Sequence, residues 1–152
     1  MDRPTGSCRE KALQLLARRP HFKLELARKL SSRGFGLEAV ESSIERLENE
    51  KYLDDYAFAM EWAAGSLRRR GLGVNGLRRE LQGRGLEDEV AGAVVERSFP
   101  NGDGELAETV GRLWSSRGGK GREALARHLE RKGFSQASIW KVLEKFEYAE
   151  PE

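Results

Sequence analysis

Hydrophobic residues along this chain recur in a helical pattern that appears three times. In each copy two leucines lie four positions apart, and a glycine with an apolar residue after it follows four positions later. The copies are Leu26–Phe35, Leu77–Leu86 and Leu125–Phe134, and their first leucines are 51 and 48 positions apart. Leucines spaced by four share one face of a helix, and a near-constant period of this size indicates repeated helical units. The pattern therefore predicts an all-α fold of three tandem repeats.

The apolar spacing within each repeat predicts three helices. In the first repeat Ser7 and Glu10 fit a capping box, and Pro20 ends the helix that they begin. A second helix is expected at about His21–Arg33, and Gly34 suits the left-handed residue that closes it. A third helix carries its apolar residues at helical spacing, at Leu37, Val40, Ile44 and Leu47.

The later repeats are read in the same way. Asn75-Gly76 would normally signal a hairpin turn, but the flanking residues have helical spacing, so we predict a helix start there. Helices are expected at about Val74–Arg84 and Glu87–Ser98, and Ser135 is expected to cap the last helix. In the third repeat the first helix carries Leu106, Val110, Leu113 and Trp114. The tryptophans share helical spacing with other apolar residues, so we expect all three in the core: Trp62, Trp114 and Trp140.

Two polar joints separate the repeats. Asp54 or Asp55 can cap the helix that follows the first joint, and Pro100–Gly104 forms a loop at the second. We expect three-helix modules at residues 1–53, 54–101 and 102–152. A unit of this size has little core of its own, so neighbours should stabilise one another in an elongated, curved array.

Charge is separated along the chain more than the total suggests. The 152 residues are 38% hydrophobic and 34% charged, with a net charge of only +2. The second helix of each repeat is basic, and the third helices of the first two repeats are acidic. The stretch Ser66–Leu86 is the most basic, with six arginines and a single acid, Glu80. Like charges at this density repel one another, which favours an anionic partner.

Stacked repeats would align the basic helices into a stripe. The candidate contact residues are Arg68, Arg69, Arg70, Arg78, Arg79, Arg84, Arg122, Arg127, Arg131 and Lys132. Such a stripe attracts phosphate backbones or an acidic protein groove, and its binding weakens as salt rises. The alternative is a solvated surface with local ion pairs, each worth about 0–1 kcal/mol.

The chain offers little for catalysis or for binding a metal or cofactor. Cys8 is the only cysteine, which excludes an internal disulfide and fits a reducing cytoplasm. With only His21 and His128 besides, no structural zinc set is available, and His128 is expected at the surface. Gly118–Gly121 lacks the spacing of a phosphate loop, and no run of about 18 apolar residues predicts a membrane span. We expect a cytoplasmic protein that is not an enzyme and uses no cofactor or metal.

Four motifs carry a resemblance to a known family. They are Ala12-Leu13-x-Leu15-Leu16-Ala17-Arg18-Arg19, Glu25-Leu26-x-x-Lys29-Leu30-x-x-x-Gly34-Phe35, Tyr52-Leu53-Asp54-Asp55-x-x-Phe58-Ala59 and Gly71-x-Gly73-x-x-x-Leu77-x-x-Glu80-Leu81-x-x-x-Gly85. Together they resemble the RecX family of regulators of the RecA recombinase, over essentially the whole chain and most densely in the first two modules. Val74 departs from the family, which commonly has Pro after Gly73, and this predicts a looser helix start. The third module diverges most.

The resemblance implies a non-enzymatic protein that binds the RecA filament on single-stranded DNA. We expect the chain to be a monomer. Family members typically inhibit the ATP hydrolysis, strand exchange and co-protease activity of the recombinase, and so modulate recombination, DNA repair and the SOS response. Two alternatives remain open. One is a helix-turn-helix-like module that binds single- or double-stranded DNA through the basic stripe, and the other is a scaffold without a nucleic-acid role. The second helices offer mainly Arg, Lys and Leu, which disfavours sequence-specific readout of bases.

Overall fold

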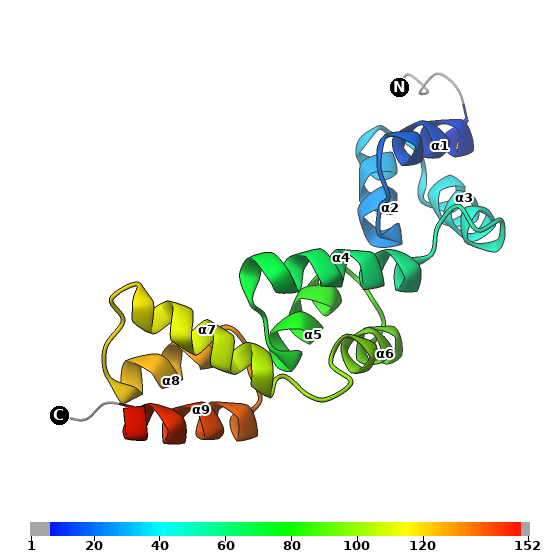
Figure 1. Ribbon diagram of the computed structural model, residues 1–152. Coiled ribbons are helices and arrows are strands. Elements are labelled where there is room, and N and C mark those ends of the chain that lie inside the picture. Colours follow the sequence, from blue (N-terminus) through cyan, green and yellow to red (C-terminus); the bar gives the residue numbers. More distant parts are fainter. Residues whose placement is uncertain (1–6, 150–152) are drawn as a thin grey trace.

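Nine helices and no strand make up the described part of the chain, residues 7–149 of the computed structural model, with side chains through Phe146. The helices are α1 (Cys8–Arg18), α2 (Lys23–Ser32), α3 (Leu37–Asn49), α4 (Asp55–Arg70), α5 (Val74–Gly83), α6 (Asp88–Ser98), α7 (Gly104–Ser116), α8 (Arg122–Arg131) and α9 (Gln136–Ala149). They form three groups of three that follow one another end to end, with a bend after the first group (Figure 1). The predicted all-α repeat fold is confirmed.

The capping box and the helix-ending glycines predicted from the sequence are present in the structure. The Ser7 hydroxyl accepts a hydrogen bond from the Glu10 amide at 3.0 Å, and the Glu10 carboxylate accepts one from the Ser7 amide, so the capping box is complete. The glycine of each repeat motif has a positive φ: 93° at Gly34, 95° at Gly85 and 80° at Gly133. Glycine adopts this left-handed conformation without the steric cost of a Cβ.

Each group of helices has its own hydrophobic core. The paired leucines of the three motifs are all fully buried: Leu26, Leu30, Leu77, Leu81, Leu125 and Leu129. Burying one such side chain contributes about 1.5–3 kcal/mol, so these pairs stabilise each group from within. Two leucines that were expected on buried apolar faces are exposed instead, Leu37 by 70% and Leu113 by 48%.

The first and second groups are joined by an aromatic contact. Phe22 precedes α2 but is buried in the core of the second group, where its ring centroid lies 4.4 Å from that of Phe58 and 6.4 Å from that of Trp62. A residue of one group thus completes the core of the next.

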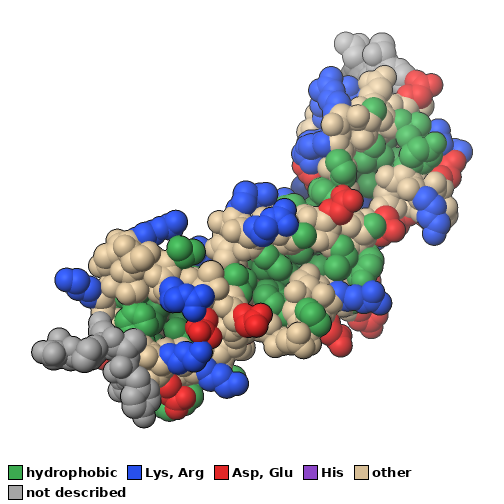
Figure 2. All heavy atoms as spheres, in the orientation of Figure 1, with side chains coloured by type: hydrophobic (Ala, Val, Ile, Leu, Met, Phe, Trp, Pro, Cys, Tyr) green, Lys and Arg blue, Asp and Glu red, His purple; other side chains and the backbone are tan. Residues whose placement is uncertain are grey.

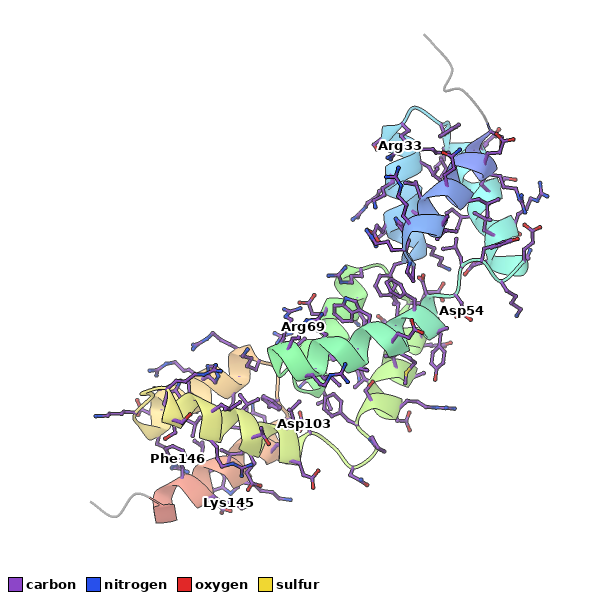
Figure 3. All side chains as sticks on the ribbon, turned by 45° about the horizontal axis from the view of Figure 1, so that its top comes forward. Arg33, Asp54, Arg69, Asp103, Lys145 and Phe146 are labelled. Carbon is purple, nitrogen blue, oxygen red and sulfur yellow. The ribbon has the colours of Figure 1, made fainter. Side chains whose placement is uncertain are left out.

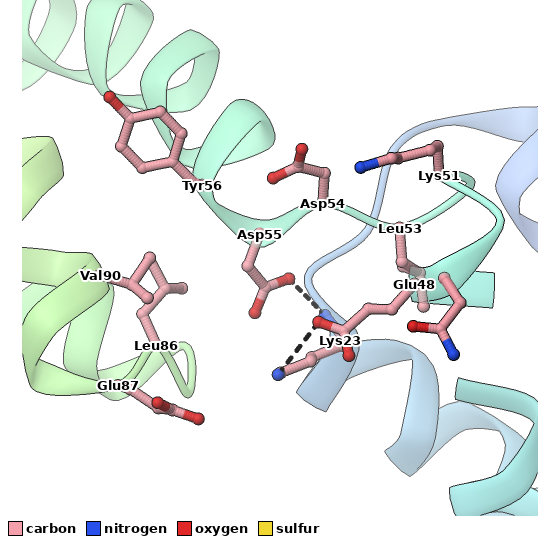
Figure 4. A pocket seen from close by; sticks show the side chains of 11 residues that line it. Lys23, Glu48, Lys51, Leu53, Asp54, Asp55, Tyr56, Leu86, Glu87 and Val90 are labelled. Carbon is pink, nitrogen blue, oxygen red and sulfur yellow. Dashed lines mark hydrogen bonds and ion pairs between the residues drawn. The ribbon is translucent and has the colours of Figure 1, made fainter. Parts of the chain in front are cut away.

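The two aspartates of the first joint have different roles (Figure 4). Asp54 caps α4 by accepting a hydrogen bond from the Ala57 amide at 3.0 Å. Asp55 instead accepts one from the backbone N–H of Lys23, the first residue of α2, at 2.8 Å. Burial raises the pKa of the Asp55 carboxyl above its ordinary value of 3.8, although the hydrogen bond from Lys23 opposes this shift. The Lys23 ammonium pairs with Glu48 at 3.2 Å.

A buried carboxylate also joins the second and third groups. Asp103 accepts four hydrogen bonds: from the Val74 amide at 3.0 Å, from the Ser135 amide and hydroxyl at 2.9 Å each, and from the Ser138 hydroxyl at 2.6 Å. Burial raises its pKa, but these bonds outweigh that effect and hold the pKa below 3.8. The predicted loosening at Val74 stays a prediction, and the Val74 N–H, which a proline would lack, donates to Asp103 at the start of α5. Ser135 caps α9 through the Ser138 amide, as expected.

Backbone contacts make the second junction close. The Gly73 amide donates to the Lys132 carbonyl at 2.9 Å, and the Asn75 and Gly76 amides donate to the Gly133 carbonyl at 2.9 and 3.2 Å. These carbonyls satisfy N–H groups that a helix start otherwise leaves without a partner. Only glycine permits the approach, since a Cβ on Gly76 would lie 2.3 Å from the Lys132 oxygen.

The expected module limits, after residues 53 and 101, lie in the connections α3–α4 and α6–α7. As domain boundaries they stay a prediction. Residues 1–6 and 150–152 lie outside the described part of the chain. Within it, no helix combines the length and the apolar character that crossing a bilayer requires.

Candidate binding surface

Basic side chains gather over α2, over α4 and around α7 on the face drawn in Figure 2. Most of the ten candidate residues are exposed: Arg68, Arg69, Arg70, Arg78, Arg79, Arg84, Arg127 and Arg131. Arg122 and Lys132 are half-buried. The ten lie in several distinct settings.

The last turn of α4 carries Arg68, Arg69 and Arg70, and Gly71 ends the helix with a φ of 61°. Cations are favourable at a helix C-terminus, where the backbone carbonyls are not paired. The Arg70 guanidinium pairs with Glu80, which is the single acid of this segment. Arg69 lies at the end of α4 near α7 (Figure 3).

A groove of about 580 Å³ opens between α4, α7 and α8, and we call it the α4–α7 groove. Its cationic and titratable lining consists of Arg68, Arg69, Arg70, Arg117, His128 and Lys132. Among the described residues that line it, none is acidic. Lys132 is fixed there, since its ammonium donates a hydrogen bond to the Arg70 carbonyl at 2.7 Å. Four of the ten sequence candidates therefore meet in one place.

Two residues of this groove were not among the predicted contact residues. Arg117 follows α7, and His128 packs beside Trp114 with ring centroids 6.0 Å apart. Burial, together with the charges of Lys132 and Arg131, lowers the pKa of His128 below 6.5. His128 was expected at the surface and is half-buried. No local pattern marks these residues, because the helices that bring them together are separate in sequence.

Arg78 and Arg79 are adjacent in sequence but lie against different elements. Arg78 lines a shallow groove along α6 that also contains Asp88, Glu89 and Glu96. Arg79 lies on the side of the third group, where one of its guanidinium nitrogens is 3.0 Å from the position that a Cβ on Gly133 would occupy. The two charges therefore have different electrostatic surroundings.

Two further candidates pack on aromatic rings. The Arg84 guanidinium lies 4.8 Å from the ring centroid of Trp62 and 6.0 Å from that of Phe22, so it covers the first junction. The Arg122 guanidinium lies 5.6 Å from the ring centroid of Trp140. The expectation that Trp140 is a core residue is wrong, since it is 58% exposed. It extends away from the α7–α9 core, whereas Trp114 packs against that core.

Among the described residues, no three His, Cys, Asp or Glu side chains converge as metal ligands would. The buried carboxylates Asp55 and Asp103 accept hydrogen bonds from helix starts, which accounts for their positions.

The fold and its charged surface define an all-α helical-repeat protein. The model of the first three-helix domain of RecX matches residues 8–47, and the model of the second matches residues 54–95. The chain belongs to the RecX family of regulatory proteins.

Individual relatives agree with this assignment. The chain is 33% identical over 128 residues to the regulatory protein RecX of Chromohalobacter salexigens, covering 83% of this chain and 84% of the relative. It is 32% identical over 147 residues to that of Vibrio vulnificus, with 90% of each covered. The crystal structure of RecX from Lactobacillus salivarius has a similar fold, with a TM-score of 0.79 at 18% identity, over 93% of this chain and 95% of that one. Another RecX crystal structure gives a TM-score of 0.80 at 19% identity, over 90% and 70%.

Proposed function

We propose that this chain binds the filament that the RecA recombinase forms on single-stranded DNA, and inhibits its ATP hydrolysis, strand exchange and co-protease activity. It would thereby modulate recombination, DNA repair and the SOS response. The observation that carries the proposal is membership of the RecX family, since both family domains match in order along the chain.

The shape and charge of the molecule suit such a partner. Three groups of helices in line form an extended surface, which can contact more than one subunit of a helical polymer (Figure 1). Arg68, Arg69, Arg79, Arg127 and Arg131 are exposed, and none forms an ion pair with a described acidic residue. Their charges are available to acidic side chains or to DNA phosphates of a filament, and binding should weaken with salt.

The action that we propose is occupancy of the filament, not chemistry. It requires no catalytic residue, cofactor or metal from this chain. We place it in the cytoplasm, with the chain acting as a monomer.

ATP hydrolysis by the recombinase on single-stranded DNA, measured with and without this chain, tests the proposal. Inhibition at stoichiometric amounts is expected. Unchanged hydrolysis contradicts the proposal. Tight binding to naked duplex DNA with sequence preference, in the absence of the recombinase, would instead support the alternative of a direct DNA-binding module.

A further inference from the structure

The α4–α7 groove concentrates positive charge from three separate parts of the chain. Arg68, Arg69 and Arg70 come from the end of α4, Arg117 from the end of α7, and Lys132 from the end of α8. Each of these cations lies at the C-terminal end of its own helix, where positive charge is favourable. The packing of the three helices brings these cationic ends together around one groove.

These charges are only partly compensated within the molecule. Arg70 pairs with Glu80, and the Lys132 ammonium binds a backbone carbonyl. No described acidic side chain pairs with Arg68, Arg69 or Arg117. Converging cations without counter-charges repel one another, and a bound anion removes that repulsion.

Part of the groove lining is apolar, and we call this part its floor. It includes Leu67, Val110, Leu113 and Trp114. Leu113 is 48% exposed, so part of this apolar lining is accessible to a ligand. A ligand that combines a chain of negative charges with flat apolar groups would contact this floor and pair with the cations of the groove at the same time.

We propose that the α4–α7 groove binds single-stranded nucleic acid, with its arginines on successive phosphodiesters and its apolar floor beneath the unpaired bases. A positively charged groove with aromatic residues is the general form of single-strand binding sites. The proposal deepens the proposed function and rests on it in one respect, because the filament would supply the strand.

The charge density favours nucleic acid over an acidic peptide. A nucleic-acid strand carries one negative charge at every residue. Five permanent cations around a groove of about 580 Å³ match such a ligand. A peptide reaches this density only in an uninterrupted acidic run. A duplex pairs its bases inward, and would leave the apolar floor uncovered.

Fluorescence anisotropy with a labelled oligothymidylate of about 16 nucleotides, a length within the usual range of single-strand sites, tests the proposal on the full chain. The test variant is Arg69→Glu/Arg117→Glu, and the matched control is Arg46→Glu/Arg97→Glu, which alters two exposed arginines of α3 and α6 by the same net charge. The test variant should weaken binding at least about tenfold, and should reduce the salt slope by about 0.7 for each lost phosphate contact. The control should change the affinity less than about twofold. Unchanged circular dichroism and Tm confirm that both variants fold.

The proposal would be overturned if the wild-type chain did not bind the oligonucleotide at low salt, if the test variant bound it no more weakly than the control variant, or if polyglutamate competed equally well. Recombinase ATP hydrolysis is measured in parallel. A chain that binds the strand through the groove but does not inhibit hydrolysis upholds the groove and contradicts the proposed function. If the test variant binds the strand normally and inhibits hydrolysis as the wild type does, the proposed function is upheld and the proposed role of the groove is overturned.

Discussion

The Oδ2 atom of Asp103, which precedes α7, lies 3.0 Å from the backbone nitrogen of Val74, the first residue of α5. The Oδ1 atom of Asp55, the first residue of α4, lies 2.8 Å from the backbone nitrogen of Lys23, the first residue of α2. At both junctions an aspartate at the start of one group therefore accepts a hydrogen bond from the second helix of the preceding group. This repeated contact orients each group on its neighbour.

Val74→Pro should lower the free energy of unfolding by about 1–3 kcal/mol relative to Val74→Ala, because it leaves a buried carboxylate without one donor. Proline at the first helical position is otherwise well tolerated, so the cost isolates this hydrogen bond. Urea denaturation followed by circular dichroism measures it. Equal stability of the two variants would show that the Asp103 contact contributes nothing.

The two junctions should respond to acid with opposite signs. The folded pKa of Asp103 lies below 3.8, so its contribution is present above that value and is lost as the pH falls through the lowered pKa. The folded pKa of Asp55 is raised, so its contribution is fully present below 3.8 and is lost as the pH rises through the raised pKa. Unfolding of the wild type, Asp103→Asn and Asp55→Asn is compared between about pH 3 and pH 7, the range that spans the carboxyl pKa values. The two differences from wild type should change in opposite directions with pH, and parallel curves would contradict this account.

Gly76→Ala should destabilise the second junction, whereas Gly83→Ala should stabilise the same helix. A Cβ on Gly76 would lie 2.3 Å from the Lys132 carbonyl oxygen, but nothing lies within 4 Å of one on Gly83. Replacing a helical glycine by alanine stabilises a protein by about 0.5–1 kcal/mol, and we expect this gain for Gly83→Ala. In Gly76→Ala the steric clash outweighs the same gain. Thermal unfolding of the pair provides the measurement. A Tm increase in both variants would mean that the second junction accommodates the added Cβ without loss of stability.

Leu81→Asp should unfold the second group, because Leu81 is fully buried and an unpaired charge would replace it. Leu37→Asp makes the same substitution at a leucine that is 70% exposed, in the first turn of α3, where an acid is favourable. Helix content and Tm should fall in the first variant and stay near wild type in the second. An unaltered Tm in Leu81→Asp would refute the core assignment.

Arg78→Glu/Arg79→Glu should weaken filament inhibition while helix content survives, since both side chains are exposed. The single variants should differ. Arg78 shares its groove with Asp88, Glu89 and Glu96, which already offset its charge, so we expect the larger loss from Arg79→Glu. Recombinase ATP hydrolysis measures the effect, with Arg46→Glu as the control. An unchanged inhibition curve for the double variant would exclude this surface from the contact.

Much of the fold was predictable because its determinants are local. The capping box at Ser7 and Glu10 depends on residues within a few positions of one another, and so does the apolar spacing that predicted the helix from Val74. The same holds for the left-handed glycines of the repeat. The errors arose where exposure depends on a distant neighbour. Trp140 has helical spacing with buried residues, but its position on α9 lies outside the core.

The candidate surface was predictable in composition but not in arrangement. Charge counting identified Arg68, Arg69 and Arg70, which the structure gathers in the α4–α7 groove with Lys132. The predicted contact residues did not include Arg117 or His128, which reach that groove from other helices. They included both Arg78 and Arg79, although these two lie against different elements.

The sequence by itself determined the nine helices of the described residues, their grouping in threes and the leucines that each core buries, since periodicity and capping act within a few turns. Only the tertiary structure decided which carboxylate holds which helix start, and which cations converge on a single groove. Those relationships join residues about 30 to 60 positions apart, such as Asp103 to Val74 and Lys132 to Arg70. Their geometry depends on how whole groups of helices pack, which no local pattern encodes.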